Sequence, residues 1–342
     1  MDQPEVSIII VNYNTCDLLR NCIASIYKHS KPVEIEILVV DNDSKDQSEQ
    51  MVKTEFPKVK WIQTGYNAGF GRANNMGIRA AKGTYGLILN SDTEFFEQTL
   101  PVSLQCHREL EKKGPVGVTT CAMVDGEGNV LFNSNTRTPF IKKLWNANPL
   151  VIAIQTKLGI KQADIYQERL AIHSRNHESE WIGGAFLLFN LSVFKELNLY
   201  LDEDFFMYGE DIEWCERIRR NGLKHYFYTD TKVLHYDGGS PNPSRNRMAQ
   251  VIISGWLCMK KIKGNAYFFV YCLLFLFNYV LDEILFRLAK AQNRTTEMDT
   301  KAKGERSFIW NLLKTYFYTI AMRYRRNPSS AKNYLKYANT TN

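Results

Sequence analysis

Short apolar runs alternate with amphipathic segments through the first quarter of the chain. Four of these runs, rich in β-branched side chains, predict buried strands at residues 6–11, 35–40, 58–63 and 85–89. The segments between them carry apolar side chains at helical spacing and predict helices at residues 17–29, 44–56 and 71–81. Strands that alternate with helices of roughly 10–15 residues are typical of an α/β fold with a mostly parallel sheet.

The pattern is less regular in the middle of the chain. Residues 116–123 and 129–132 predict two strands joined by a turn. Further on, the sequence predicts a strand at 181–189, a helix at 211–221 and short strands at 226–235. Residues 136–180 show no clean period, and we interpret them as a long insertion within a domain that covers residues 1–245.

Residues 266–281 are almost uninterruptedly apolar and aromatic. The run is shorter than the ~20 residues that cross a bilayer comfortably. Three interpretations stay open: a helix buried against the main domain, a helix lying in the membrane interface, and a membrane span. A basic segment around residues 306–326 favours the interfacial helix, because cationic side chains beside an apolar helix bind anionic lipid. We therefore predict a helical, membrane-associating region at residues 246–342.

Charge is unevenly distributed along the chain. The net charge is +7, but residues 287–342 hold twelve basic and three acidic side chains, so the rest of the chain is slightly acidic. A basic tail fits either nucleic acid or membrane lipid, and the aromatic helix beside it makes lipid the predicted partner and excludes nucleic acid. The seven cysteines stand singly without a C-x-x-C pair, which is typical of reduced thiols in a cytosolic protein.

Polar side chains follow each of the first four predicted strands. Ligands bind at the carboxyl ends of the strands in an open α/β sheet, so the topology would bring these side chains to one rim. They are Asn12 and Asn14 after the first strand, Asp41 after the second, Asn67, Gly69, Arg72 and Asn75 after the third, and Asn90, Ser91 and Asp92 after the fourth. Each alone is also typical of a turn or a helix N-cap, and for Asp43 and Ser44 that interpretation is preferred.

Asp41 and the glycine-containing loop have definite ligand chemistry. Asp41 directly follows apolar residues, and a carboxylate at a strand tip can accept the N–H of a pyrimidine ring. The segment from Asn67 to Arg72 is either a loop before a helix or a phosphate cradle of backbone N–H groups assisted by Arg72. It differs from the dinucleotide fingerprint, because it follows the third strand and Asn74 takes the place of the last glycine.

Two further acidic sites suit a cation and a base. Asp92 is a typical ligand for Mg²⁺ or Mn²⁺ beside a diphosphate, and His235 can add an imidazole, whereas a lone histidine is more often structural. Glu210 and Asp211 begin a helix after an aromatic segment. Acids in that position either stabilise the helix dipole or provide a general base.

Seven motifs occur in an order that resembles family 2 glycosyltransferases of the GT-A fold. The resemblance is closest to the rhamnosyltransferase-type members that build bacterial surface polysaccharides such as lipopolysaccharide. The motifs lie between about residues 5 and 245: Val-Asn-Tyr-Asn, Val-Val-Asp-Asn-Asp-Ser, Asn-x-Gly-Phe-Gly-Arg-Ala-Asn-Asn, Leu-Asn-Ser-Asp, Trp-Ile-Gly-Gly-Ala, Gly-Glu-Asp-Ile-Glu-Trp-Cys and His-Tyr-Asp-Gly-Gly-Ser.

The resemblance implies roles for single residues. Asp92 would be the metal ligand of the family's D-x-D motif, His235 a further ligand, and Asp211, with Glu210 beside it, the catalytic base. Asn90 stands where many relatives have the first acid of D-x-D, which puts the metal affinity in question. The donor nucleotide would be bound by Asn12, Asn14, Asp41, Asn67, Gly69, Arg72, Asn75, Asn90 and Ser91. The acceptor would be bordered by Trp181, Gly183 and Gly184, with residues 136–180 as an acceptor-side insertion.

These features together predict an inverting, metal-dependent glycosyltransferase that adds one sugar to a lipid-linked glycan at the cytoplasmic face of the membrane. One base opposite one leaving group suits a single displacement. The first donor expected is dTDP-rhamnose, with UDP-galactose, UDP-glucose or a UDP-N-acetylhexosamine as the alternative. A nucleotidyltransferase, a glycoside hydrolase and a non-catalytic membrane-binding protein are the rival classes. A processive synthase is disfavoured, because the chain has no Gln-x-x-Arg-Trp motif.

Overall fold

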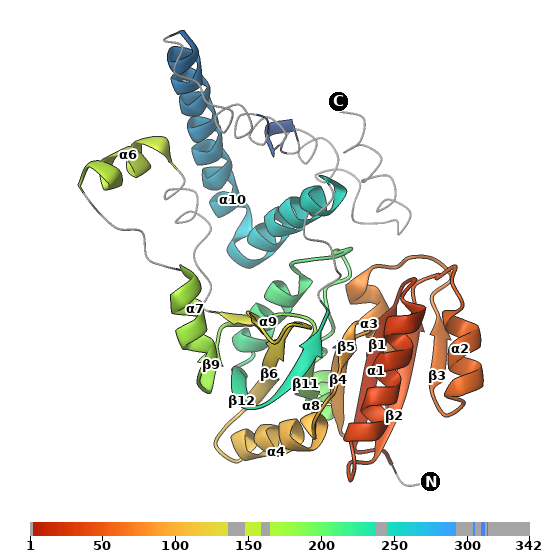
Figure 1. The fold of residues 1–342 in the computed structure, drawn as a ribbon. Helices are drawn as coiled ribbons and strands as arrows, with labels where there is room; N and C mark the ends of the chain where they lie inside the picture. The colour runs from red at the N-terminus through yellow and green to blue at the C-terminus, as the bar shows by residue number, and fades with distance from the viewer. Residues whose placement is uncertain are drawn as a thin grey trace. The chain divides into compact units, whose positions relative to one another are not determined.

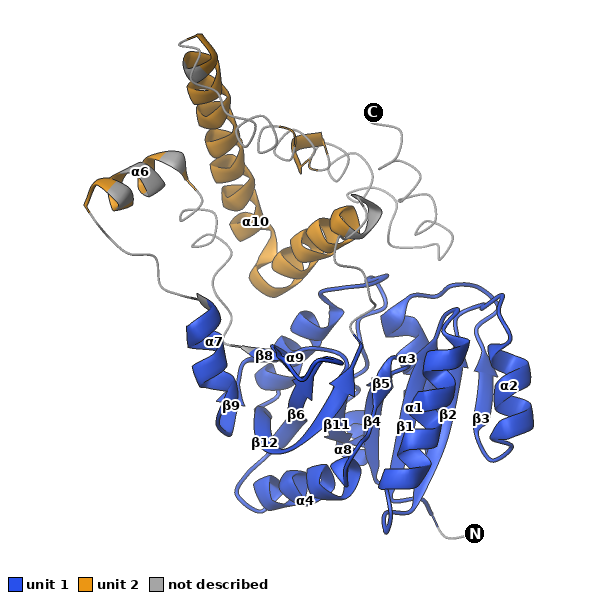
Figure 2. Ribbon diagram, in the orientation of Figure 1, with its two compact units in different colours: residues 1–137, 164–241 blue, residues 138–163, 242–342 orange. Residues whose placement is uncertain are grey.

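The computed structural model describes residues 3–135, 148–158, 165–236 and 245–291, and residues 304, 309–311 and 313. The chain forms two compact units, which are coloured separately in Figure 2. The first unit comprises residues 1–137 and 164–241, and the second comprises residues 138–163 and 242–342. All predicted nucleotide, metal and catalytic residues belong to the first unit.

A mixed sheet forms the centre of the first unit (Figure 1), with the strand order β3-β2-β1-β4-β11-β6-β12-β5. Strands β1 to β4 are parallel, β11 is antiparallel to both of its neighbours, and β12 is parallel to β6. The strands are β1 (Val6–Asn12), β2 (Ile35–Asp41), β3 (Lys60–Gln63), β4 (Tyr85–Asn90), β5 (Thr93–Glu94), β6 (Val116–Val124), β11 (Phe186–Asn190) and β12 (Lys224–His235).

Four short strands extend this arrangement. Strand β7 (Val130–Leu131) pairs with β6, and β9 (His177–Ser179) pairs with β12. Strands β8 (Ser134–Asn135) and β10 (Trp181–Ile182) pair with each other in a separate two-stranded sheet.

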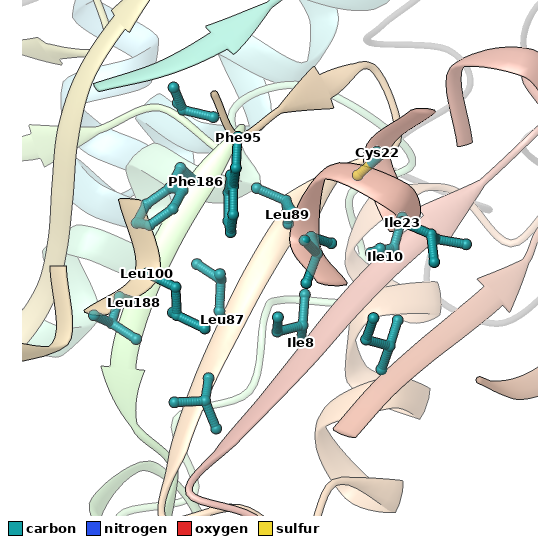
Figure 3. Packing of buried hydrophobic residues seen from close by; sticks show 14 of the residues in the cluster. Ile8, Ile10, Cys22, Ile23, Leu87, Leu89, Phe95, Leu100, Phe186 and Leu188 are labelled. Atoms are coloured by element: carbon teal, nitrogen blue, oxygen red, sulfur yellow. The ribbon is translucent and has the colours of Figure 1, made fainter. Parts of the chain in front are cut away.

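Helices cover both faces of the central sheet. One face packs against α1 (Cys16–His29), α2 (Ser48–Glu55) and α4 (Thr99–Glu111), and the other against α3 (Phe70–Ala80), α8 (Leu191–Glu196) and α9 (Glu210–Arg220). Successive side chains of a strand point to opposite faces, so Ile8 and Ile10 belong to the first core and Ile9 to the second. Figure 3 shows the first core, where Ile23 of α1 and Leu100 of α4 belong to the cluster around Ile8 and Ile10. Burial on both faces explains why these strands read as continuous apolar runs.

The predicted α/β fold with a mostly parallel sheet is confirmed, and several element boundaries need correction. Helix α2 begins at Ser48 instead of residue 44, and the short strands expected at 226–235 are one irregular strand, β12, that begins at Lys224. Helices α4 and α8 were not predicted. In α4, Pro101 looks like a helix breaker, but it lies in the first turn, where proline is tolerated because its missing N–H has no helical partner.

The single strand predicted at residues 181–189 is wrong. Strand β10 ends at Ile182, β11 begins at Phe186, and the two belong to different sheets. Between them the Gly183 N–H donates to the carbonyl of Asn133 at 2.7 Å, and the Ala185 carbonyl accepts from the Asn90 N–H at 3.0 Å. Small residues at 183–185 thus let the chain cross from the small sheet into the central one.

The described parts of residues 136–180 contain regular structure, in contrast to the irregular insertion that we predicted. Helix α6 (Pro149–Lys157) belongs to the second unit, and α7 (Ile165–His173) and β9 belong to the first. The remainder of the predicted insertion lies outside the described residues.

The second unit is dominated by α10 (Arg245–Ala291), which Gly264 interrupts with a φ of 84°. A small core forms around it from Ala249, Ile253, Trp256, Met259, Phe268, Cys272 and Leu313. Within the described chain, Met248–Leu288 is long and apolar enough to cross a membrane, judged by length and composition. Its second half exposes large apolar side chains: Phe269, Val270, Leu273, Leu276, Phe277, Val280, Ile284, Leu285 and Leu288. The predicted basic segment at 306–326 lies almost wholly outside the described residues.

Candidate active site

The ends of β1 and β2 meet in a hydrogen-bonded cluster around the buried carboxylate of Asp41. Its Oδ1 accepts from Asn12 Nδ2 at 2.8 Å and from Ser44 Oγ at 2.6 Å, and its Oδ2 accepts from the Ser44 N–H at 2.9 Å. A carboxylate offers about four lone-pair directions, so one direction on Oδ2 is left for a ligand. The N–H of a pyrimidine ring requires one acceptor of this kind.

Ser44 also fixes the loop after β1. Its Oγ accepts from the Asn14 N–H at 2.8 Å, and Asn14 Oδ1 accepts from the Lys45 N–H at 2.7 Å. Asn14 has a left-handed φ of 55°, which asparagine tolerates better than most residues. We expected Ser44 to act only as a turn or cap residue, but the structure makes it the link between Asn12, Asn14 and Asp41.

Gly69 allows the loop after β3 to touch the segment that precedes α9. Its φ is 81°, and a Cβ at this position would collide with the carbonyl oxygen of Phe206. The Phe70 N–H donates to that same oxygen at 2.9 Å. The side chain of Asn42 holds the loop from the other side, donating to the Gly69 carbonyl at 3.1 Å and accepting from the Ala68 N–H at 3.2 Å. The glycine is therefore required by packing, independently of any donor contact.

The other predicted residues of this loop differ in how much of their polar surface is free. Asn67 Oδ1 accepts from the Gly69 N–H at 3.1 Å, and Arg72 is half-buried with Nη1 at 3.5 Å from the Ala68 carbonyl. Asn75 is buried, and its amide donates to the Leu201 carbonyl at 2.9 Å and to Glu203 Oε1 at 3.0 Å. Because both hydrogens of that amide are used, Asn75 positions the segment after α8, and its contact with the donor stays a prediction.

The structure brings Asp92 and His235 together from distant parts of the chain. Strand β5 pairs with the end of β12 so that His235 lies opposite Thr93, and the Tyr236 N–H donates to the Asp92 carbonyl at 2.9 Å. This register places Asp92 Oδ1 at 3.2 Å from His235 Nε2, with the two side chains 17% and 13% exposed. The residues that we predicted as metal ligands are therefore adjacent.

A carboxylate and an imidazole fit a cation that is shared with a substrate. Within the described residues, no group of three or more His, Cys, Asp or Glu side chains is arranged to hold a metal ion. Mg²⁺ and related cations usually keep several waters and bind substrate phosphate, so two protein ligands are sufficient for such a site. Ser91 lies just before Asp92, and its Oγ accepts from Thr15 Oγ1 at 2.9 Å, which ties the end of β4 to the loop after β1.

Glu210 and Asp211 begin α9 after two residues of left-handed backbone, Tyr208 and Gly209. Burial raises the pKa of both carboxyls, and the charge of Asp211 raises the pKa of Glu210 further. The pKa of Asp211 is raised less, because N–H groups oppose the effect of burial, including that of Ile212, which donates at 2.8 Å. Asp211 is therefore the member of the pair that ionises first and can accept a proton near neutral pH.

Trp181 and Gly184 lie beside Asp211. The N–H groups of the Trp181 indole and of Gly184 both favour the ionised form of Asp211 and so lower its pKa, although the buried indole nitrogen makes no hydrogen bond of normal geometry to the described residues. Gly184 packs against the Phe70 ring, and the hydrogen bond from Asn90 to Ala185 joins this segment to the end of β4. The acceptor-side residues that we predicted thus reach the same rim as Asp92.

The predicted residues consequently share one edge of the sheet. Two contributors escaped the sequence analysis: Asn42, whose amide clamps the loop at 67–70, and Phe206, whose carbonyl requires Gly69. Asn42 directly follows Asp41, which is a weak signal in retrospect. Phe206 contributes only its backbone here, and a sequence pattern does not reveal that kind of contact.

Several known proteins are similar to this chain. The Glycosyl transferase family 2 sequence model matches residues 7–164. The low-salt glycan biosynthesis hexosyltransferase Agl10 of Haloferax volcanii is 28% identical over 64% of this chain and 63% of its own length. The N-acetylglucosaminyl-diphospho-decaprenol L-rhamnosyltransferase of Mycobacterium tuberculosis is 24% identical over 68% of this chain and 76% of its own. The rhamnosyltransferase WbbL of Escherichia coli is 25% identical over 68% and 83%. The match to Agl10 thus spans a little under two thirds of that relative.

Solved structures agree with the fold. The mannosyltransferase PcManGT from Pyrobaculum calidifontis, solved with GDP-mannose and Mn²⁺, superposes with a TM-score of 0.54 over 99% of this chain and 87% of that one, at 17% identity. Staphylococcus aureus TarS 1–349 in complex with UDP gives 0.51 over 90% and 79%, also at 17% identity. The predicted GT-A architecture is confirmed. Residues 7–164 therefore match the family 2 glycosyltransferase model, and the described fold agrees with that of solved glycosyltransferases.

Proposed function

We propose that the protein is an inverting, metal-dependent enzyme that transfers one sugar from a nucleoside-diphosphate donor to a hydroxyl of a lipid-linked glycan. The shared rim is the observation that carries this proposal. A half-buried carboxylate of raised pKa, Asp211, lies on the same edge of the sheet as the adjacent pair Asp92 and His235. One base and one leaving-group site suit a single in-line displacement, which inverts the anomeric carbon.

Asp211 removes the proton of the attacking hydroxyl. Burial raises its pKa and so makes it a stronger base than an ordinary carboxylate. The N–H groups of Ile212 and Gly184 stabilise the ionised form and hold it in place. Glu210, whose pKa is raised further, keeps its proton and leaves a single negative charge on the pair.

The donor is held on the opposite part of the rim. Asp41 offers its remaining lone pair to the nucleobase, and Arg72, at the start of α3, supplies a cation at the predicted phosphate loop. A divalent cation held by Asp92 and His235 would neutralise the charge on the departing diphosphate. The imidazole favours Mn²⁺ over Mg²⁺, because Mg²⁺ prefers an all-oxygen ligand set.

Rhamnose from dTDP-rhamnose is the first donor to examine, since two of the relatives are named rhamnosyltransferases. A UDP-hexose or UDP-N-acetylhexosamine is the second, because another relative is named only a hexosyltransferase. The test is to incubate the enzyme with a panel of dTDP- and UDP-sugars and a polyprenyl-diphosphate acceptor, with and without a chelator. Transfer is measured by the nucleoside diphosphate released, and the anomeric configuration of the product is determined by NMR. Release of inorganic pyrophosphate, retention of configuration, or full activity in the chelator would each contradict part of the proposal.

We further propose that the enzyme works at the cytoplasmic face of the cell membrane, peripherally or shallowly inserted. The exposed apolar side chains of α10, together with the basic residues beyond it, support this location. A variant in which Phe269, Leu273 and Phe277 are changed to serine should leave the membrane fraction. Serine at buried positions of the first unit is not a suitable control for this variant. Serine at Tyr13 and Tyr27, two exposed aromatics of the first unit, is the matched control. Equal membrane binding of both variants would exclude α10 as the anchor.

A further inference from the structure

A row of exposed apolar side chains runs along α6 and past its end. Leu150, Ile154 and Leu158 are 48%, 57% and 68% exposed, and the Leu158 N–H still donates to the Ile154 carbonyl at 2.9 Å, so the helical turn continues beyond Lys157. Residues four apart lie on one face of a helix, so these three side chains form a single apolar row. Scattered apolar side chains are normal on a protein surface, but an ordered row is typical of an interaction surface.

Asn148 fixes the start of α6 and ties it to α10 within the second unit (Figure 2). Its Oδ1 accepts from the N–H groups of the second and third helical residues at 3.0 and 3.3 Å, and Pro149 follows it in the first turn, where proline is favoured. Its Nδ2 donates to Asn278 Oδ1 at 2.6 Å. Asn278 is the only amide side chain in the apolar run 266–281, and an amide in apolar surroundings costs free energy unless it is hydrogen-bonded. The pair therefore joins α6 to the half of α10 that exposes large apolar side chains.

The segment that carries α6 leaves and re-enters the first unit beside the predicted acceptor edge. It follows β8, which pairs with Trp181 and Ile182 of β10, and it leads into α7. Ser134 of β8 lies between His173 of α7 and His177 of β9, with its Oγ 3.1 Å from Nε2 of each ring. The two ends of the segment are thus held together next to β10, and a surface that binds α6 is connected through the chain to that edge.

Charge separates the two units. The first unit contains 22 lysines and arginines against 31 aspartates and glutamates, whereas the second contains 21 against five, so their net charges are −9 and +16. The part of the second unit that includes α6, residues 138–163, has four lysines and no acid. Two copies of so basic a unit repel each other, whereas an anionic bilayer attracts it. The charge together with the apolar row therefore favours an anionic lipid surface over a second copy of the chain.

We propose that α6 is a second membrane contact of this enzyme, and that its apolar row enters the surface of an anionic bilayer together with the exposed side chains of α10. Interfacial helices bury an apolar face about 5–10 Å into the lipid boundary while their lysines stay at the headgroups, and Lys157 is exposed at the end of α6. The inference rests on the membrane association proposed above. It adds that the segment linked to the predicted acceptor edge is itself held at the lipid, where a lipid-linked acceptor is located.

The first test compares vesicle binding of the full-length chain with that of two matched variants. Ile154→Ser with Leu158→Ser interrupts the apolar row, and Tyr27→Ser with Leu197→Ser removes two exposed large side chains of the first unit. On vesicles of phosphatidylcholine with about one third phosphatidylglycerol, sedimentation should show at least about tenfold weaker binding for the α6 variant and unchanged binding for the control, because only the first variant loses apolar side chains that enter lipid. Every chain should bind pure phosphatidylcholine more weakly. Equal binding of the α6 variant and the wild type would overturn the inference and leave α10 as the anchor.

The second test locates α6 directly. An environment-sensitive fluorophore is attached to Ile154→Cys in a chain whose half-buried Cys16 and Cys106 are changed to serine, since the other five cysteines are buried. We expect lipids that carry a quencher to reduce its fluorescence about as strongly as that of a label on Phe277→Cys, whereas a label on Tyr27→Cys should be unaffected. Quenching on Phe277→Cys alone, or burial of the Ile154→Cys label by a second copy of the chain in solution, would overturn the inference and keep the proposed location. Absence of vesicle binding by the wild type would contradict the proposed membrane location as well.

Discussion

The part of the rim around Asp41, the proposed donor half, and the part around Asp211, the proposed acceptor half, differ in how completely their polar atoms are hydrogen-bonded. On the donor half, the Asp41 carboxylate accepts three hydrogen bonds within the protein, and Asn42 both donates and accepts. On the acceptor half, the Glu210 Oε2 and the Trp181 indole nitrogen are buried without a hydrogen-bond partner among the described residues. Unpaired buried polar groups cost stability, so they persist where function uses them. The carboxylate on the proposed donor half is thus held by protein hydrogen bonds, whereas the proposed acceptor half keeps unpaired polar atoms beside Asp211.

The strongest test of this contrast is Asp211→Asn. The amide cannot take the proton of the acceptor, so kcat should fall by about 10²–10⁴-fold while the donor Kd, measured by calorimetry, stays unchanged. Glu216→Gln on the same helix is the control and should keep wild-type turnover. Near-normal turnover of Asp211→Asn would mean that the base lies elsewhere.

Asp92→Ala should have the next largest effect. Loss of the carboxylate removes the anionic ligand of the predicted cation, whose effect on a transferring diphosphate amounts to several kcal/mol, so kcat/KM should fall by at least about 100-fold. Titration with Mn²⁺ should show weaker metal activation in this variant, and Glu196→Ala, an exposed acid on α8, should match the wild type. Unaltered metal activation would exclude Asp92 as a ligand.

Gly69→Ala probes the contact between the two halves. A side chain here is strained by its positive φ and also collides with Phe206, so the free energy of unfolding should fall by about 1–3 kcal/mol, and donor binding should weaken. Gly128→Ala is the matched control, because Gly128 has a similar φ of 85° with open space around it, and it should lose only about 1 kcal/mol. Equal losses in chemical denaturation would show that Phe206 does not constrain Gly69.

Glu210→Gln should have the smallest effect of the four. Both carboxyls have raised pKa values, so activity should disappear as pH falls through the raised pKa of Asp211, above the range of an ordinary carboxylate. Since Glu210 is the later of the two to ionise, its amide analogue should keep kcat within about tenfold and leave the acidic limb of the pH profile in place. A loss as large as that of Asp211→Asn would mean that Glu210 works as an anion.

Site residues could be predicted from the sequence where the proposed role depends on one side chain and on its position at the end of a strand. Asp41 and Asp92 were identified because each follows an apolar strand, and parallel topology then requires their strands to end at the same edge. His235 could be placed beside Asp92 only through the resemblance, since the pairing of β5 with β12 leaves no local signal. The break between β10 and β11, the clamp by Asn42 and the position of Ser134 between two histidines depend on contacts between distant backbones, which residue periodicity does not encode.

The reversed direction of β11 has a consequence for how specificity can change. A parallel strand is followed by a loop at the rim, but β11 runs the other way and begins at the rim, so residues 183–185 lie at the proposed acceptor edge. Segments upstream of these residues can therefore be exchanged between relatives without altering the loops that follow β1 to β4. Grafting a relative's residues 136–180 should retarget the recipient glycan and leave the nucleotide preference as it was.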